Sequence, residues 1–168
     1  FLPGDSLLFA AGTFAGMGGG GGADYRMLGV IAKDPRGGLL FVKLVGPKAK
    51  VDGARAAETG LKIVQDMFMS SMLPVFDPHG FLYTALARAH DEVVALGSDV
   101  AVDFRPRATC AVCLVQEGGA YWAHIGDSRI YQVRDRRVLV RSRDHSHVEV
   151  LIQEGAITEE EAQDHPMR

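Results

Sequence analysis

The feature that most constrains the fold is a series of four short strand patterns in the second half of the chain. In each pattern β-branched, aromatic or other apolar residues predominate, and turn-forming residues separate one pattern from the next. The patterns cover residues 108–116, 120–125, 129–133 and 137–142. Turns at 117–119 and 134–137 join the outer pairs of these strands, and strands joined by such short connections pair as antiparallel neighbours. This part of the chain therefore favours antiparallel sheets.

The first half of the chain predicts a hairpin followed by two helices. Residues 24–32 and 39–45 are strand-like, and the Asp-Pro-Arg-Gly-Gly sequence at 34–38 is typical of a turn. Apolar residues then recur at helical spacing over 52–72 and over 79–96. Strands, then helices, then strands again favour the α+β class, in which helices pack outside antiparallel sheets.

The two ends of the chain carry shorter signals. Residues 1–15 are strand-prone, and the glycine run at 16–22 predicts a loop, because no P-loop lysine follows it. Near the C-terminus, Ser146 is expected to cap one helix. Thr158 and Glu161 form a capping box at the start of another helical segment.

Length and composition narrow the function classes. The chain suits a single domain over residues 1–168, whose first 23 residues are a glycine-rich segment. The net charge of −3 argues against a nucleic-acid-binding protein, which normally carries a strongly basic surface. No run of apolar residues is long enough to cross a membrane as a helix. Cys110 and Cys113 have a C-x-x-C spacing but lack the second pair that zinc needs, so we expect two buried, reduced thiols and a cytoplasmic protein.

Arginines gather late in the chain, between residues 134 and 143, where they flank three apolar residues. They are Arg134, Arg136, Arg137, Arg141 and Arg143. We interpret them as part of a solvated strand face, and the alternative is a binding patch.

Four motifs follow one another in a fixed order. They are Gly126-Asp127-Ser128-Arg129, Asp144-His145-Ser146, Ile-Thr-Glu-Glu-Glu-Ala at 157–162, and His165-Pro166. With this ordered set, the chain resembles the metal-dependent protein phosphatases of the 2C type, particularly the bacterial branch, over roughly residues 24–168.

The resemblance implies a four-layer α/β/β/α sandwich of two antiparallel sheets flanked by helices, truncated here before the last strands. Active members of the family hold two manganese or magnesium ions between aspartates, and a metal-bound water attacks the phosphorus of phosphoserine or phosphothreonine. Asp127 takes the place of an aspartate that can hold an additional metal, and the alternative is that it only caps its turn. Further metal-binding aspartates of the family belong to segments that would follow residue 168.

The strongest metal motif of the family, D-G-M-G-G-H, is altered in this chain. Val45 stands where the bridging aspartate is expected, whereas Gly46 is retained and could offer its carbonyl oxygen. Lys48 and Lys50 replace a glycine and the histidine. A valine cannot ligate a cation, and two ammonium groups would repel one.

A second departure lies upstream, where the family has an N-E-D or N-Q-D motif preceded by a phosphate-binding arginine. Asp24 keeps the final acid, but Gly22 and Ala23 replace the other two residues. The arginine is absent, and Arg26 would be offset on its strand. The sequence therefore assigns no catalytic and no phosphate-binding residue. The remnants of a metal site are Asp24, Gly46 and Asp127.

Other polar residues are weaker candidates. Asp52, directly before a predicted helix, is expected to cap that helix rather than to replace a missing metal ligand. His145 and His147 would share one face if their segment were a strand, but we expect this segment to lead into a helix. Ser128 lacks the sequence context of a catalytic nucleophile.

Three functional hypotheses follow. The first is a pseudophosphatase with impaired metal binding, which acts by binding a phosphoprotein, a kinase or another regulatory protein. The second is an active manganese- or magnesium-dependent serine/threonine phosphatase that uses Asp127, Asp24 and acids supplied beyond residue 168. The third is a structural module that forms a homodimer through unpaired sheet edges.

Overall fold

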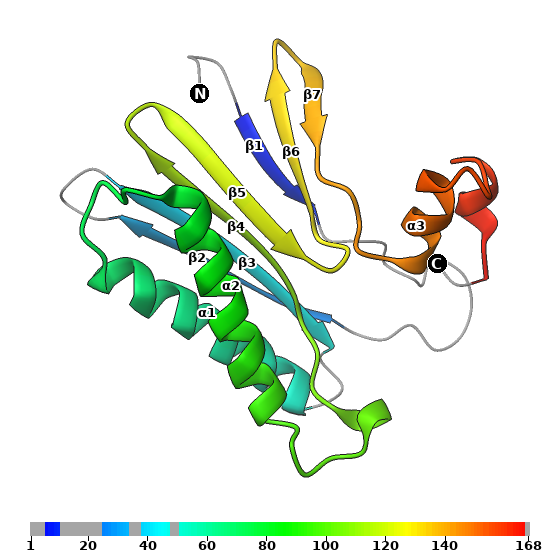
Figure 1. The fold of residues 1–168 in the computed structure, drawn as a ribbon, viewed down its shortest axis with the longest axis horizontal. Coiled ribbons are helices and arrows are strands. Elements are labelled where there is room, and N and C mark those ends of the chain that lie inside the picture. The colour runs from blue at the N-terminus through cyan, green and yellow to red at the C-terminus, as the bar shows by residue number, and fades with distance from the viewer. Residues whose placement is uncertain (1–5, 11–24, 34–37, 48–50, 167–168) are drawn as a thin grey trace.

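The computed structural model of the chain describes residues 6–10, 25–33, 38–47 and 51–166. Two antiparallel sheets face each other in this structure, and two long helices cover the outer face of one of them (Figure 1). The fold class expected from the sequence, α+β with antiparallel sheets flanked by helices, is confirmed.

The larger sheet holds four strands in the order β2-β3-β4-β5, and each strand is antiparallel to its neighbours. The strands are β2 (Tyr25–Lys33), β3 (Leu39–Pro47), β4 (Thr109–Gln116) and β5 (Gly119–Ile125). The register places Val45 of β3 opposite Met27 of β2 and opposite Thr109 of β4. Strand β3 therefore runs two residues further than the sequence pattern predicted and includes both Val45 and Gly46.

Two helices, α1 (Val51–Ser70) and α2 (Pro78–Ala95), pack on one face of this sheet. Helix α2 begins with Pro78 and is capped by Asp77, whose Oδ1 accepts a hydrogen bond from the Gly80 N–H at 2.9 Å. Helix α1 begins at Val51, so the expectation that Asp52 precedes and caps it is wrong. Asp52 lies inside the first turn.

The main core lies between these helices and the sheet. Alternate residues of β3 and β4 meet apolar residues of both helices there, because every second side chain of a strand points to the same face. The fully buried members are Leu40, Val64, Phe68, Ala57, Leu82, Ala85, Val112 and Leu114. Each large apolar side chain removed from water contributes about 1.5–3 kcal/mol to folding.

The smaller sheet has the order β1-β6-β7 and is also antiparallel. Its strands are β1 (Ser6–Ala10), β6 (Arg129–Arg134) and β7 (Arg137–Arg141). Ala111 and Cys113 of β4 are fully buried although they point away from the helices, which is explained by this second sheet on the other side (Figure 1).

The remaining elements are short, namely η1 (Val102–Phe104), α3 (His147–Gln153) and η2 (Glu161–Asp164). Ser146 caps α3 as predicted, since its Oγ accepts a hydrogen bond from the Glu149 N–H at 3.2 Å. The capping box of Thr158 and Glu161 is also present, but the element that follows is a single 3₁₀ turn.

Both cysteines are free and buried, as the strand pattern predicted. Cys110 points toward the helices and Cys113 toward the smaller sheet. Burial in apolar surroundings raises the pKa of both thiols to about 12, so both are protonated at neutral pH. Across the described residues, no helix combines the length and the apolar character needed to cross a membrane.

Candidate functional site

The turn between β5 and β6 carries the Gly126-Asp127-Ser128 sequence and joins the two sheets. Gly126 has a φ angle of +89°, which residues with a side chain rarely adopt. A Cβ atom on Gly126 would lie 2.6 Å from Cγ2 of Thr109. Both the backbone angle and the close approach therefore require glycine, which confirms the expected sharp turn before Asp127.

Ser128 fixes the other side of this turn. Its side chain is fully buried, and its Oγ lies 2.6 Å from Oγ1 of Thr109 in a hydroxyl–hydroxyl hydrogen bond. Thr109 is also the register partner of Val45. The turn with Asp127 therefore packs against Thr109 of β4, the strand that separates it from Val45 at the end of β3, where the family resemblance puts the metal motif.

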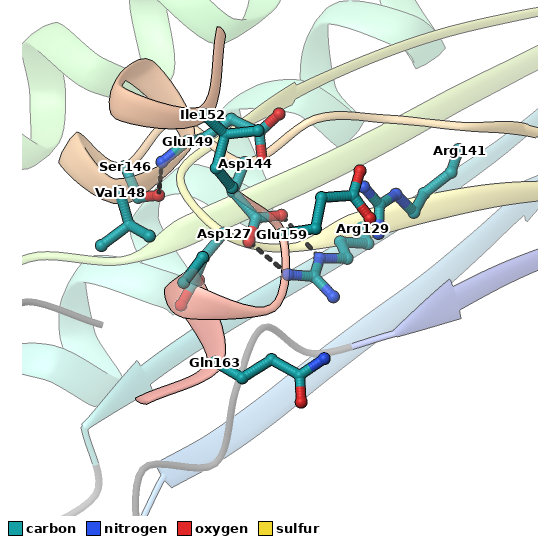
Figure 2. A pocket seen from close by; sticks show the side chains of 11 residues that line it. Asp127, Arg129, Arg141, Asp144, Ser146, Val148, Glu149, Ile152, Glu159 and Gln163 are labelled. Atoms are coloured by element: carbon teal, nitrogen blue, oxygen red, sulfur yellow. Dashed lines mark hydrogen bonds and ion pairs between the residues drawn. The ribbon is translucent and has the colours of Figure 1, made fainter. Parts of the chain in front are cut away.

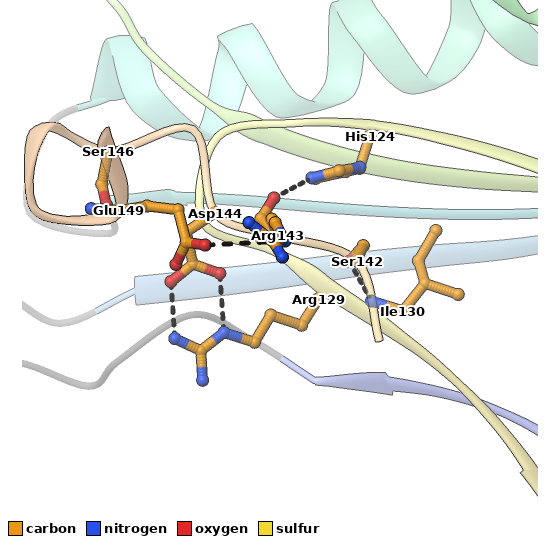
Figure 3. A network of polar contacts seen from close by, with 8 residues as sticks. All are labelled: His124, Arg129, Ile130, Ser142, Arg143, Asp144, Ser146 and Glu149. Carbon is orange, nitrogen blue, oxygen red and sulfur yellow. Dashed lines mark hydrogen bonds and ion pairs between the residues drawn. The ribbon is translucent and has the colours of Figure 1, made fainter. Parts of the chain in front are cut away.

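A bidentate ion pair connects the start of β6 with the segment before α3. Nε and Nη2 of Arg129 donate to Oδ1 and Oδ2 of Asp144 at 2.6 and 2.5 Å (Figures 2 and 3). The Arg129 side chain is 23% exposed and that of Asp144 is 11% exposed. The hydrogen bonds to Asp144 raise the pKa of the Arg129 guanidinium further above its already high value.

The imidazoles of His124 and His145 form a second set of contacts between strand β5 and the segment before α3. The rings of His124 and His145 stack with centroids 4.5 Å apart. His124 Nε2 lies 2.6 Å from the carbonyl oxygen of Arg143 (Figure 3), and the His145 N–H donates to the carbonyl oxygen of Gly126 at 2.9 Å. Desolvation and the neighbouring His124 lower the pKa of His145, although Asp144 opposes this effect.

A cavity of about 190 Å³ lies next to this ion pair (Figure 2). Asp127 lines it together with residues of β6, β7, α3 and the η2 region. The other lining residues are Arg129, Arg141, Asp144, Ser146, Val148, Glu149, Ile152, Glu159, Ala162 and Gln163. Since Arg129 and Asp144 bind each other, Asp127, Glu149, Glu159 and Arg141 are the other charged groups that a ligand in the cavity would meet.

The described part of this site does not fit a pair of metal ions. Among the described residues, no three His, Cys, Asp or Glu side chains are grouped so as to hold a metal. Asp127 is the one predicted ligand whose side chain is described, whereas Asp24, Lys48 and Lys50 lie outside the described residues. Val45 and Gly46 are placed by strand register alone.

The structure also shows whether His145 and His147 lie on one strand or lead into a helix. His147 is the first residue of α3, so the option in which His145 and His147 share a strand face is wrong. The Arg129–Asp144 pair was not foreseen, although both residues belong to the motifs that carry the resemblance. Their separation of 15 residues follows no helical or strand period, so sequence spacing gave no signal for their contact.

Comparison with known proteins gives relatives of one kind. A protein phosphatase 2C-type protein of Streptococcus pyogenes is 41% identical over 90 residues, which cover 52% of this chain and 35% of that protein. The serine/threonine protein phosphatase PstP of Mycobacterium tuberculosis is 34% identical over 85 residues, covering 50% of this chain and 16% of PstP. The chain thus spans about a third or less of these curated relatives. No protein-family model matches the chain.

Solved structures agree with these relatives. The serine/threonine phosphatase Stp1 from Staphylococcus aureus superimposes with a TM-score of 0.75 at 23% identity, covering 98% of this chain and 62% of Stp1. The PstP catalytic domain in complex with two manganese ions gives a TM-score of 0.57 at 20% identity, covering 94% of this chain and 64% of that domain. At such low identity these structures establish the shared fold.

The first prediction concerns the turn. Gly126→Ala should lower the free energy of unfolding by about 2 kcal/mol or more, because it combines an unfavourable φ with a contact against Thr109. Chemical denaturation measures this change. Gly118→Ala is the control, since Gly118 also has a positive φ but a Cβ there meets nothing within 4 Å. Equal losses in the two variants would contradict the role of the Thr109 contact.

The second prediction concerns the ion pair. Asp144→Asn should reduce the free energy of unfolding by about 2–3 kcal/mol, because it leaves the partly buried Arg129 guanidinium without its counter-charge. Arg143→Ala breaks a looser pair, with Arg143 Nε 4.0 Å from Glu149 Oε1 and the Arg143 side chain 66% exposed. It should cost less than about 1 kcal/mol. Urea denaturation of both variants measures the two losses in the free energy of unfolding. A larger loss in Arg143→Ala than in Asp144→Asn would contradict the prediction.

The third prediction concerns pH. Because the pKa of His145 is lowered in the folded state from its usual 6.5, the unfolded chain binds a proton at this residue more readily than the folded chain. This contribution makes the folded state less stable as the pH falls below about 6.5. His145→Gln should therefore lose less stability than the wild type between pH 7.5 and 5.5, measured by denaturation at both pH values. An identical pH dependence in both proteins would refute this.

Proposed function

We propose that this chain is a pseudophosphatase domain with impaired metal binding. Its homologues and structural neighbours, which are bacterial protein phosphatase 2C-type serine/threonine phosphatases, support the phosphatase-like domain, and the proposed loss of metal binding rests on Val45. The domain would act by binding a phosphoprotein, a kinase or another regulatory protein. We further propose a cytoplasmic location, where two buried thiols stay reduced.

The observation that carries this proposal is the position of Val45. The strand register puts Val45 opposite Thr109, and Thr109 contacts both Gly126 and Ser128 of the turn that holds Asp127. The family resemblance assigns this position to the aspartate that bridges the two ions. Manganese and magnesium require oxygen ligands, and the hydrocarbon side chain of valine has none.

The charged residues around Asp127 support the same conclusion. Asp144 is engaged by Arg129 through both carboxylate oxygens, which leaves it poorly suited to bind a cation as well. In the sequence, Lys48 and Lys50 follow Val45 closely and add positive charge where the family has none. Among the ligands expected from the family resemblance, Asp127 is the one described carboxylate, and one carboxylate is too little to hold two divalent ions, which take six or more oxygen ligands each.

The second candidate function is an active phosphatase that hydrolyses phosphoserine or phosphothreonine with manganese or magnesium. The lining of the cavity by Asp127 favours it, because that carboxylate is available at the family's position. Asp24, the Gly46 carbonyl and acids from beyond residue 168 would supply the other ligands. When bound, the ions would lower the pKa of a water and stabilise charge on the phosphate.

Manganese binding separates the two functions when it is measured on a protein that includes the segments expected to follow residue 168, because the active enzyme would need their acids. We expect this longer protein to show neither stoichiometric Mn²⁺ binding in the millimolar range or tighter, measured by calorimetry and by the electron paramagnetic resonance signal of free Mn²⁺, nor turnover of p-nitrophenyl phosphate. Asp127→Asn should leave both results unchanged. Stoichiometric binding with turnover, both abolished in Asp127→Asn, would establish the active enzyme and overturn the proposal.

A further inference from the structure

Strand β7 is exposed on both faces along its whole length. All five of its residues are exposed, including Val138, Leu139 and Val140 at 58%, 48% and 45%. Consecutive residues of a strand point to opposite faces, so a strand that lies within a sandwich normally buries every second side chain. Here the three apolar residues at the centre of β7 are accessible from either side.

The outer edge of β7 is also unpaired within the described part of the chain. β7 is the last strand of the β1-β6-β7 sheet, and it pairs with β6 alone among the described residues (Figure 1). Such an edge presents main-chain N–H and C=O groups that can bond to a further strand. An open edge next to exposed apolar side chains is the feature that peptide-binding domains use for strand addition.

Charge identifies the partner that this edge fits. The segment 134–143 contains five arginines and one aspartate, although the chain as a whole has a net charge of −3. Arg136, Arg137 and Arg141 flank the apolar residues of β7 and are all exposed. A strand carrying carboxylates would therefore meet opposite charge at both ends of β7.

The same charge argues against two other occupants. A second copy paired through β7 would bring two arginine-rich segments together, and like charges directly opposite in a strand pair are destabilising. A nucleic-acid strand could neutralise the arginines, but it offers no regular row of amide groups to continue the sheet.

We propose that β7 binds an extended, carboxylate-rich segment of a partner protein as an additional strand of the β1-β6-β7 sheet. Main-chain hydrogen bonds supply the pairing, Val138, Leu139 and Val140 provide apolar contacts, and the arginines select acidic sequences. The inference rests on the proposed function insofar as that function requires a protein partner. It names the surface and the chemistry of the interaction, and it needs no metal.

The probe is a fluorescein-labelled peptide of about eight residues, in which glutamate alternates with valine or threonine, a length matched to a short strand. Fluorescence anisotropy should show saturable 1:1 binding to the chain that weakens as salt is raised. A peptide with lysine in place of glutamate should bind at least about tenfold more weakly, a difference of about 1.4 kcal/mol. The acidic peptide with N-methylated amides tests whether main-chain bonds are needed, and it should not bind.

Paired variants locate the site. Arg136→Glu combined with Arg137→Glu should weaken binding of the acidic peptide about tenfold or more. Arg55→Glu combined with Arg88→Glu changes the net charge equally at exposed positions on α1 and α2, and it should bind like the wild type. Val138→Thr combined with Val140→Thr keeps strand propensity and should weaken binding by removing apolar contacts. Circular dichroism and thermal unfolding confirm that each variant is folded.

Several results would overturn the inference. Equal binding of the acidic and lysine peptides, full binding of the N-methylated peptide, or equal effects of the two charge-reversal variants would each exclude strand addition at β7. Tighter binding of a single-stranded oligonucleotide would assign the arginines to nucleic acid. A dimer seen by light scattering and lost in Val138→Thr with Val140→Thr would assign β7 to a second copy. Each failure leaves the manganese result untouched, so the two proposals fail separately.

Discussion

The close contact between the β5–β6 turn and Thr109 holds the two halves of the fold in their relative positions. The chain leaves the four-stranded sheet at Ile125 and enters the three-stranded sheet at Arg129, so only three residues make the crossing. Gly126 fits against Thr109 without a side chain, and Ser128 is bonded to the same threonine. The Arg129–Asp144 pair and the two stacked imidazoles then connect the crossing to the start of α3.

Much of this architecture can be read from the sequence because local periodicity and turn chemistry agree with the final fold. The strands between residues 108 and 142 and the two long helices were all expected within two residues of their observed ends. The differences are local. The sequence did not show that Asp52 lies inside the first turn of α1 rather than capping it, because the residues before Val51 carry no clear signal for the start of a helix. The capping box at Thr158 predicts where a helical turn begins, but it does not determine how long the turn continues.

The candidate site was predictable only as a set of motifs. Sequence order indicated that Asp127 follows a glycine turn, and the structure explains this turn through Thr109. The partners of Arg129, His124 and His145 depend on how two sheets meet, which no local pattern encodes. Fold similarity likewise does not determine activity, because the chemistry of such a domain depends on a few carboxylates. Val45 pairs in the sheet like its neighbours, so the ligand loss that we propose at this position leaves the strand intact.

The two buried cysteines can be used to measure how often the fold opens, because a reagent can label them only when they become exposed. Alkylating reagents attack the thiolate, and the raised pKa values and the burial of Cys110 and Cys113, which are 6% and 0% exposed, keep that species scarce and poorly accessible in the closed sandwich. Cys110 lies under the helices, whereas Cys113 lies between the sheets. The rates at which the two positions become labelled therefore compare how often the helical layer detaches with how often the sheets separate.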